Sequence, residues 1–204
     1  MTQADPRMPK AEYGTLLSIQ TGRVRPLMVS GRKLASAIGK TPVSGPVEVG
    51  VMGLLGDEQA DPTVHGGLSK AVYAMPSEHL PWWRAQRQTR GATMFEEDLT
   101  PGLLGENLSL QGVLEEDLFI GDALQFGDVV LRVTQPREPC GKFNAVMAYS
   151  QAAKDMVLSG RCGFYLAVDR PGVLQAGATF EVIPGPRATS VLQALQHKAW
   201  KHLR

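Results

Sequence analysis

Residues 123–134 read Ala-Leu-Gln-Phe-Gly-Asp-Val-Val-Leu-Arg-Val-Thr, and this stretch decides the fold class. Two runs rich in apolar and β-branched residues flank the pair Gly127-Asp128, a pattern typical of a β-hairpin with a two-residue turn. Further strands are expected at residues 15–20, 47–51, 164–168 and 179–183, the last two around a Pro171-Gly172 turn. The 22 glycines and 14 prolines are spread along the chain, which indicates many short segments joined by turns, as in a strand-rich barrel.

Helices are expected to be fewer and to lie at the periphery. The segments with helix-end signals are residues 77–83, with Ser77 as candidate N-cap, residues 150–159, ended by Gly160, and residues 190–200, opened by the capping-box pair Ser190 and Gln193. The sequence therefore predicts a mostly β (α+β) domain over residues 14–204 that ends in a C-terminal helix. Residues 1–13 form a polar N-terminal lead-in before it.

Charge and composition exclude several classes of function. The 21 basic and 20 acidic side chains give a net charge of +1, so no general field favours nucleic acid or an anionic membrane surface, although residues 31–40 are locally basic. No apolar run approaches the roughly 20 residues that span a bilayer, and the N-terminus lacks the pattern of a secretory signal. We therefore expect a cytoplasmic protein without membrane or nucleic-acid partners.

The segment around Cys140, residues 135–142, carries the sharpest chemical signal. Arg137 and Lys142 flank the cysteine, and two prolines stiffen the approach to it. Nearby cations favour the thiolate and lower the pKa from the free value of about 8.5, so either metal binding or nucleophilic chemistry is open. The alternative is that Cys140 is a small buried apolar residue, as a free cysteine commonly is. Cys162, between glycines, is expected to be structural.

Three other segments combine glycine with polar residues: Gly56-Asp57-Glu58-Gln59, Val64-His65-Gly66-Gly67-Leu68-Ser69-Lys70 and Gly105-Glu106-Asn107. Taken singly, Gly-Asp pairs usually mark turns, and a lone histidine is more often structural than a ligand. A structural zinc site is not expected, because no second Cys or His lies near Cys140. The motifs of P-loop nucleotidases and serine hydrolases are absent. Two cysteines are too few for a four-cysteine iron–sulfur cluster.

The motifs in chain order resemble those of MOSC domains, and most of all the compact bacterial YiiM-type members. They are residues 53–61 (GLLGDEQAD), His65-Gly66-Gly67 followed by Lys70-Ala71-Val72, Gly105-Glu106-Asn107, Gly121-Asp122, and Gln135-Pro-Arg-Glu-Pro-Cys140. The resemblance runs from about Gly14 to Trp200. Each motif is weak alone, but their order and spacing together are specific.

This resemblance implies a single mixed β-barrel that binds the molybdenum cofactor, a molybdopterin carrying Mo, with Cys140 bonded to the metal. It also implies reduction of N-hydroxylated compounds, such as hydroxylamino-purine base analogues, with electrons from an external flavin or iron–sulfur reductase. The cofactor phosphate would meet Lys40, Lys70, Arg137 and Lys142; Gly66 and Gly67 would allow close approach of the backbone; and His65, Asn107 and Asn144 would hydrogen-bond the pterin. Asp57, Glu106 and His65 are candidates for proton transfer.

Two other functions stay open at this point. Cys140 could carry a persulfide and hand sulfur onward as a transferase without bound metal. The domain could also bind or deliver the cofactor without turnover. The small-molecule substrate, the electron donor and the oligomeric state do not follow from the sequence.

Overall fold

The hairpin expected around Gly127-Asp128 is present, and it forms one side of a closed barrel. Its strands are β9 (Ala123–Phe126) and β10 (Val129–Pro136), with Val129 paired to Phe126 across the turn. The computed structural model describes residues 12–61, 66–93 and 99–202. Residues 1–11, most of the predicted lead-in, lie outside the described part of the chain. The other strands are β1 (Glu12–Thr21), β2 (Arg25–Val29), β3 (Arg32–Ser36), β4 (Thr41–Pro42), β5 (Val47–Gly50), β6 (Gly53–Leu54), β7 (Val72–Pro76), β8 (Leu108–Gln111), β11 (Phe164–Arg170), β12 (Gly172–Leu174) and β13 (Thr179–Ile183).

The barrel has seven strands in the order β13-β9-β10-β11-β7-β8-β1, and it closes because β1 pairs with β13. All neighbours are antiparallel except β7 and β8, which run parallel, so the barrel is mixed as predicted. β4 adds to the edge of β1, and β12-β5-β6 and β2-β3 form two small separate sheets. The connection after β11 therefore differs from the simple turn expected at Pro171-Gly172, because residues 172–174 form strand β12 and pair with β5.

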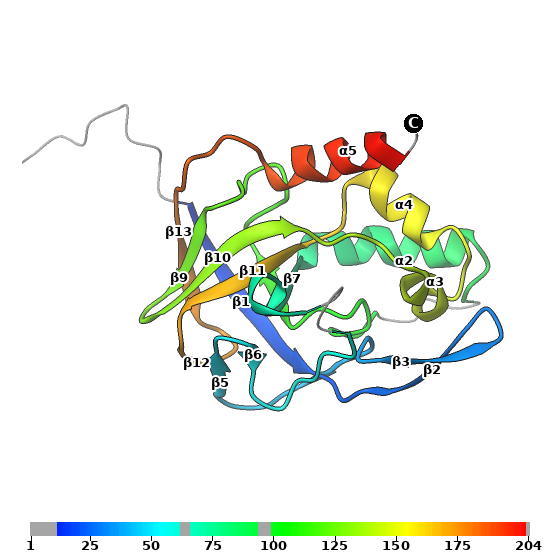
Figure 1. Ribbon diagram of the computed structural model, residues 1–204, viewed down its shortest axis with the longest axis horizontal. Helices are drawn as coiled ribbons and strands as arrows, with labels where there is room; N and C mark the ends of the chain where they lie inside the picture. The colour runs from blue at the N-terminus through cyan, green and yellow to red at the C-terminus, as the bar shows by residue number, and fades with distance from the viewer. Residues whose placement is uncertain (1–11, 62–65, 94–98, 203–204) are drawn as a thin grey trace, which may run out of the picture.

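The helices gather on one side of the barrel, with α5 along its top in the view of Figure 1. They are the short 3-10 helices η1 (Leu68–Lys70) and η2 (Ser77–His79), and the α-helices α2 (Leu80–Thr89), α3 (Gly141–Met147), α4 (Ala152–Ser159) and α5 (Val191–His202). No helix in the described part of the chain is long and apolar enough to cross a membrane.

Two of the three predicted helix ends are confirmed. Gly160 ends α4 in the left-handed conformation, and Ser190 and Gln193 form both hydrogen bonds of a capping box, at 2.9 and 3.2 Å. The prediction for Ser77 is wrong. The chain enters α2 through the 3-10 turn η2, so His79 is the residue before the helix, and the Ser77 hydroxyl contacts Glu78.

Strands β7 and β11 separate two apolar cores. Val72 and Ala74 point into the barrel, whereas Tyr73 and Met75 point outward to a second core under the helices. β11 divides in the same way, with Tyr165 on the helix side. This second core holds buried side chains from α2, α3, α4 and α5: Trp83, Phe143, Met147, Met156 and Leu195. The outer face of β7 and β11 is thus where side chains from strands and helices meet.

Candidate functional site

A cleft that encloses about 640 Å³, part of it open to solvent, lies against the outer face of β7 and β11. Segments far apart in the sequence supply its walls. The candidate residues that line it are Lys40, Asp57, Lys70, Asn107, Arg137, Cys140 and Lys142. Further lining residues include Ser36, Ala37, Ile38, Tyr73, Leu104, Gly105 and Tyr165. The structure therefore brings seven of the twelve predicted site residues to one cavity.

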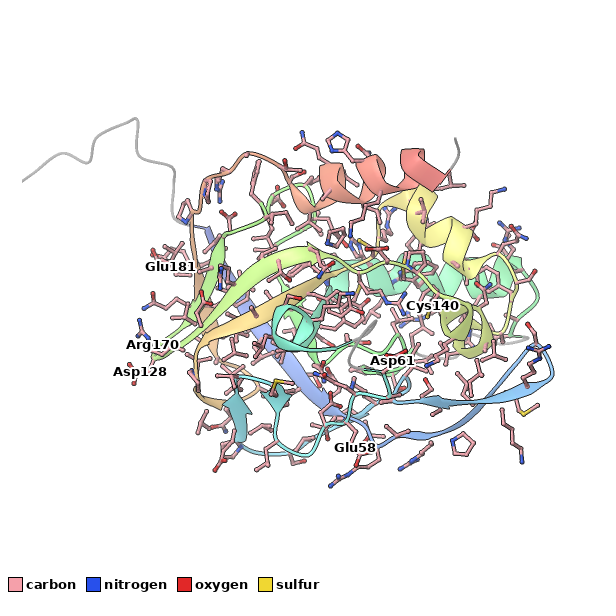
Figure 2. The ribbon with its side chains drawn as sticks, in the orientation of Figure 1. Glu58, Asp61, Asp128, Cys140, Arg170 and Glu181 are labelled. Carbon is pink, nitrogen blue, oxygen red and sulfur yellow. The ribbon has the colours of Figure 1, made fainter. Side chains whose placement is uncertain are left out.

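Cys140 is partly exposed on the wall of this cleft, where the chain passes from β10 into α3. Its backbone is extended, and its carbonyl accepts a hydrogen bond from the Phe143 N–H at 2.9 Å as the helix begins. Figure 2 shows Cys140 beside α3, with Asp61 from the loop after β6 close to it in the view. The segment before Cys140 is tied to α5 by an ion pair between Glu138 and Lys198. The Cys140 thiol is thus held at a defined place in the cleft.

Arg137 is a buried cation that contacts the Cys140 thiol. Only 4% of the residue is exposed, and its guanidinium lies 5.7 Å from the ring centre of Tyr73 and 5.2 Å from that of Phe143. Burial lowers the pKa of Arg137, but Tyr73, Tyr165 and a hydrogen bond with Cys140 outweigh it, so the net pKa is raised. One guanidinium nitrogen donates to the Glu138 carbonyl at 2.8 Å. A permanent positive charge beside the sulfur stabilises the thiolate over the thiol.

Lys40 and Asp57 form a buried ion pair in another part of the wall, and each side chain is 7% exposed. Asp57 also accepts hydrogen bonds from the Gly22 N–H at 2.7 Å and from Asn107 Nδ2 at 2.8 Å. The amide oxygen of Asn107 in turn accepts from the Tyr73 N–H at 3.1 Å. Asp57 therefore anchors three chain segments and, with its oxygens engaged, is poorly placed to transfer protons.

The two remaining lysines of the cleft contact other parts of the chain. Lys70 lies over the Tyr165 ring, 5.6 Å from its centre, and the Lys142 ammonium donates to the Ala35 carbonyl at 2.8 Å. Four cations, Lys40, Lys70, Arg137 and Lys142, line the cavity together with three carboxylates, Asp57, Glu58 and Asp61. The cations outnumber the carboxylates by one, so the cavity favours an anionic ligand over a cationic one.

Glu106 lies behind the wall of the cleft. It is 1% exposed, while its neighbours Gly105 and Asn107 line the cavity. One carboxyl oxygen accepts from the Gly102 N–H at 2.6 Å, and the other, Oε2, has no hydrogen-bond partner among the residues that the structure describes. Burial raises the pKa of Glu106 to about 7, although the Gly102 N–H opposes the shift. Glu106 can therefore exchange a proton near neutral pH.

Four predicted site residues do not line the cleft, and one cannot be placed. Asn144 accepts a hydrogen bond from the Ala153 N–H at 2.7 Å and so joins α3 to α4. Gly67 has φ 81° and ψ 178°, and its N–H donates to the side chain of Gln59, which lines the cleft. Gly66 is buried beside it, and Glu106 lies behind the wall. His65 lies outside the described residues.

Sequence reasoning missed two aromatic residues of the site, Tyr73 and Tyr165. They are paired directly across β7 and β11, with ring centres 5.5 Å apart. Burial raises the pKa of Tyr165, with Arg137 opposing, so its hydroxyl stays protonated at neutral pH. Tyr165 falls within the strand expected at residues 164–168, whereas no strand was expected around Tyr73. β7 is buried along its whole length, so no alternation in the sequence marks Tyr73.

Cys162 differs from Cys140 in every respect that matters for chemistry. It is fully buried, its thiol donates to the Gly163 carbonyl at 3.0 Å, and burial raises its pKa well above the ordinary value. In residues 12–61, 66–93 and 99–202 no cluster of three or more His, Cys, Asp or Glu side chains could hold a metal ion. A metal in the cleft would have to bring further ligands of its own beside the Cys140 sulfur.

The model of the MOSC domain family matches residues 61–181, more than half of the chain. The chain belongs to the MOSC domain family. It is 36% identical to Protein YiiM of Escherichia coli over 159 residues, 78% of this chain and 69% of that protein. It is 35% identical over 180 residues to a protein of Gibberella moniliformis named "Reductase", covering 87% of this chain but 31% of the larger protein.

A solved MOSC-type structure agrees with the fold. YiiM from Geobacillus stearothermophilus superposes with a TM-score of 0.70 at 30% identity, covering 93% of this chain and 85% of that one. The prediction of a YiiM-type MOSC protein with a mixed β-barrel is therefore confirmed.

Proposed function

We propose that the cleft binds the molybdenum cofactor with the Cys140 thiolate as a metal ligand, and that the protein reduces N-hydroxylated compounds such as hydroxylamino-purines. The observation that carries this proposal is the contact between a partly exposed thiol and a buried arginine, in a cleft with three further cations. Membership of the MOSC family and the name of the "Reductase" relative support it.

The residues of the cleft fit this cofactor in three ways. Thiolate is a soft ligand, suited to a metal that already carries sulfur ligands from the pterin. Lys70 and Lys142 lie at separate points of the wall and offer positive charge to a phosphate, whereas the charge of Lys40 is paired with Asp57. The rings of Tyr73 and Tyr165 provide flat apolar surface beside them for a heterocycle.

When bound, the cofactor would supply two-electron chemistry for cleavage of an N–O bond. The balance is one hydroxylamine, two electrons and two protons, which give one amine and one water. Arg137 places a positive charge beside the Cys140 sulfur, and such a charge favours the anionic form that binds metal. Glu106, with a pKa of about 7, can hold and release a proton at Oε2. The protonated Tyr165 hydroxyl can donate a hydrogen bond into the cleft. Neither a flavin nor an iron–sulfur motif is seen in the sequence, so the electrons would come from another protein.

The test is to express the protein in a host that makes the cofactor, and to measure molybdenum, pterin and the reduction of 6-hydroxylaminopurine by dithionite-reduced methyl viologen. We expect about one molybdenum per chain, and loss of both metal and turnover in Cys140→Ser, since a hydroxyl is a far weaker ligand than a thiolate. Cys162→Ser is the matched control. A serine hydroxyl can make the same hydrogen bond to Gly163, so metal content should stay unchanged.

Other outcomes would point to the two alternatives. A protein that contains no molybdenum but gains 32 Da on Cys140 after treatment with a sulfur donor would be a persulfide carrier. A protein with a full complement of cofactor and no turnover would be a binding or delivery module. Equal turnover in wild type and Cys140→Ser would reject the assignment of Cys140.

A further inference from the structure

Positive charge is concentrated in the N-terminal part of this nearly neutral chain. Residues 14–47 contain no aspartate or glutamate and five basic residues: Arg23, Arg25, Arg32, Lys33 and Lys40. Two of the five are neutralised by the loop after β6, since Arg23 pairs with Glu58 and Lys40 with Asp57. Three cations remain, and all three lie on β2 and β3.

The β2–β3 hairpin exposes these cations together with apolar side chains. Arg25, Arg32 and Lys33 are exposed, and their side chains form no ion pair or hydrogen bond with any described residue. Met28, paired to Lys33, is 54% exposed, and Leu34, two residues from Arg32, is 41% exposed. Successive residues of a strand point to opposite faces, so Arg25, Arg32 and Leu34 share one face of the hairpin, whereas Met28 and Lys33 lie on the other. The face with two unpaired arginines and an exposed leucine suits an acidic partner that carries apolar groups.

This hairpin also borders the cleft. Directly after β3, residues 36–38 line the cavity, and the Lys142 ammonium next to Cys140 donates to the carbonyl of Ala35 on β3. Figure 1 shows β2 and β3 running past α3 and away from the barrel. A protein bound to the hairpin would therefore lie against the side of the cleft that carries Cys140.

We infer that the β2–β3 hairpin is the docking surface for an acidic electron-donor protein. The inference rests on the proposed reductase function, which needs two electrons from outside the chain. Partners that exchange electrons and separate again use small interfaces, and complementary charge steers their encounter. Arg25, Arg32 and Lys33 supply the steering charge, which acts over a distance, and Leu34, on the same face as Arg25 and Arg32, supplies a small apolar contact.

The experiment compares a protein donor with a chemical one. The substrate is 6-hydroxylaminopurine, and the donors are reduced flavodoxin, a small acidic flavin protein, and reduced methyl viologen. In Arg32→Glu/Lys33→Glu we expect kcat/KM for flavodoxin to fall about tenfold in about 50 mM salt, and the loss to shrink in about 0.5 M salt as charges are screened. Turnover with viologen should not change, because neither residue lines the cleft. The control is Arg170→Glu, an exposed cation at the opposite end of the molecule from Cys140 (Figure 2).

A second readout needs no turnover. Carbodiimide coupling with flavodoxin should join the Lys33 ammonium to flavodoxin carboxylates, and Arg32→Glu should reduce the yield whereas Arg170→Glu should not. If the wild type shows no turnover with reduced viologen, the reductase function is rejected. The carbodiimide coupling with flavodoxin would still test the docking surface. The docking inference is overturned if Arg32→Glu/Lys33→Glu and Arg170→Glu respond alike to flavodoxin. It is equally overturned if the hairpin binds duplex DNA more tightly than flavodoxin.

Discussion

Lys40 and Asp57 form an ion pair in the wall of the cleft, with each side chain 7% exposed. The pair joins the chain after β3 to the loop after β6, and Asp57 extends the connection to Gly22 and Asn107. Removing two charges from water is costly, and this cost is offset only while both partners are present. The shape of the cleft therefore depends on the pair being intact.

Asp57→Asn should lower the free energy of unfolding by about 3 kcal/mol, because it leaves the Lys40 ammonium buried without a counter-charge. Urea denaturation followed by tryptophan fluorescence measures the change. The control is Asp169→Asn, which breaks the exposed pair with Arg132, and it should cost only a small fraction of that energy. Equal losses in the two variants would mean that Lys40 finds water when its partner is removed.

Glu106→Gln should change the pH dependence of stability. The pKa of Glu106 is about 7 in the folded protein and near 4.5 when unfolded. Below pH 4.5 both states are protonated, and as the pH rises to 7 the unfolded state loses its proton first. Wild type should therefore lose about 3 kcal/mol relative to Glu106→Gln between pH 4.5 and pH 7, at 1.36 kcal/mol per unit. The free energies of unfolding of both proteins at pH 4.5, 6 and 8 give this difference. A difference that does not change with pH would mean that Glu106 has the pKa of an ordinary carboxyl group.

Most of the strands that face water on one side could be predicted from the sequence, whereas of the two strands between the cores β11 was predicted and β7 was not. β9, β10 and β13 show alternation or a turn signal. All five residues of β7 are buried, because Tyr73 and Met75 pack under the helices while Val72 and Ala74 fill the barrel. A short, fully buried run has no period that identifies it. The β2–β3 hairpin was missed for the opposite reason, since its exposed residues lack an apolar face.

The site divides in a similar way. Motif order and residue type indicated Cys140, Arg137, Asp57 and Asn107, and all four line the cleft. Sequence could not show that Asn144 bonds the next helix, because that depends on how α3 packs against α4. Nor could it show that Arg137 is buried against aromatic rings, an environment made by residues more than 60 positions away as well as by near neighbours.

Gly67→Ala should destabilise the fold rather than block the cleft. The backbone at Gly67 has φ 81° and ψ 178°, a region that is essentially closed to other residues, and the strain is about 1–3 kcal/mol. Gly141→Ala is the control, since glycine is not required there by a positive φ and an added Cβ would lie 3.7 Å from Val29. Thermal unfolding and molybdenum content should fall together in Gly67→Ala. Loss of metal from a fully stable variant would place this backbone at the cofactor.

Arg137→Met should slow alkylation of Cys140 by iodoacetamide at pH 7 about tenfold, because the thiolate loses its adjacent positive charge. Arg137→Lys should recover part of the rate, since the ammonium keeps the charge but lacks the planar fork. The rates are measured on metal-free protein, where mass spectrometry resolves modification of Cys140 from that of Cys162. Circular dichroism of each variant separates this effect from unfolding. Identical rates in the three proteins would show that Arg137 serves packing alone.

Tyr165→Phe should lower turnover with 6-hydroxylaminopurine about tenfold while molybdenum content stays unchanged. The substitution keeps the ring, so packing against Tyr73 and the Lys70 contact remain, and only the hydroxyl is lost. This hydroxyl is protonated at neutral pH and belongs to a residue of the cleft wall, so it can donate a hydrogen bond to a substrate oxygen. Tyr149→Phe is the matched control, because Tyr149 is partly buried outside the cleft and interacts with Asp155. The two variants should have similar thermal stability, and rates are compared per molybdenum bound. Full turnover in Tyr165→Phe would mean that Tyr165 serves only as an apolar part of the cleft wall, and it would leave Glu106 and His65 as the candidates for supplying a proton.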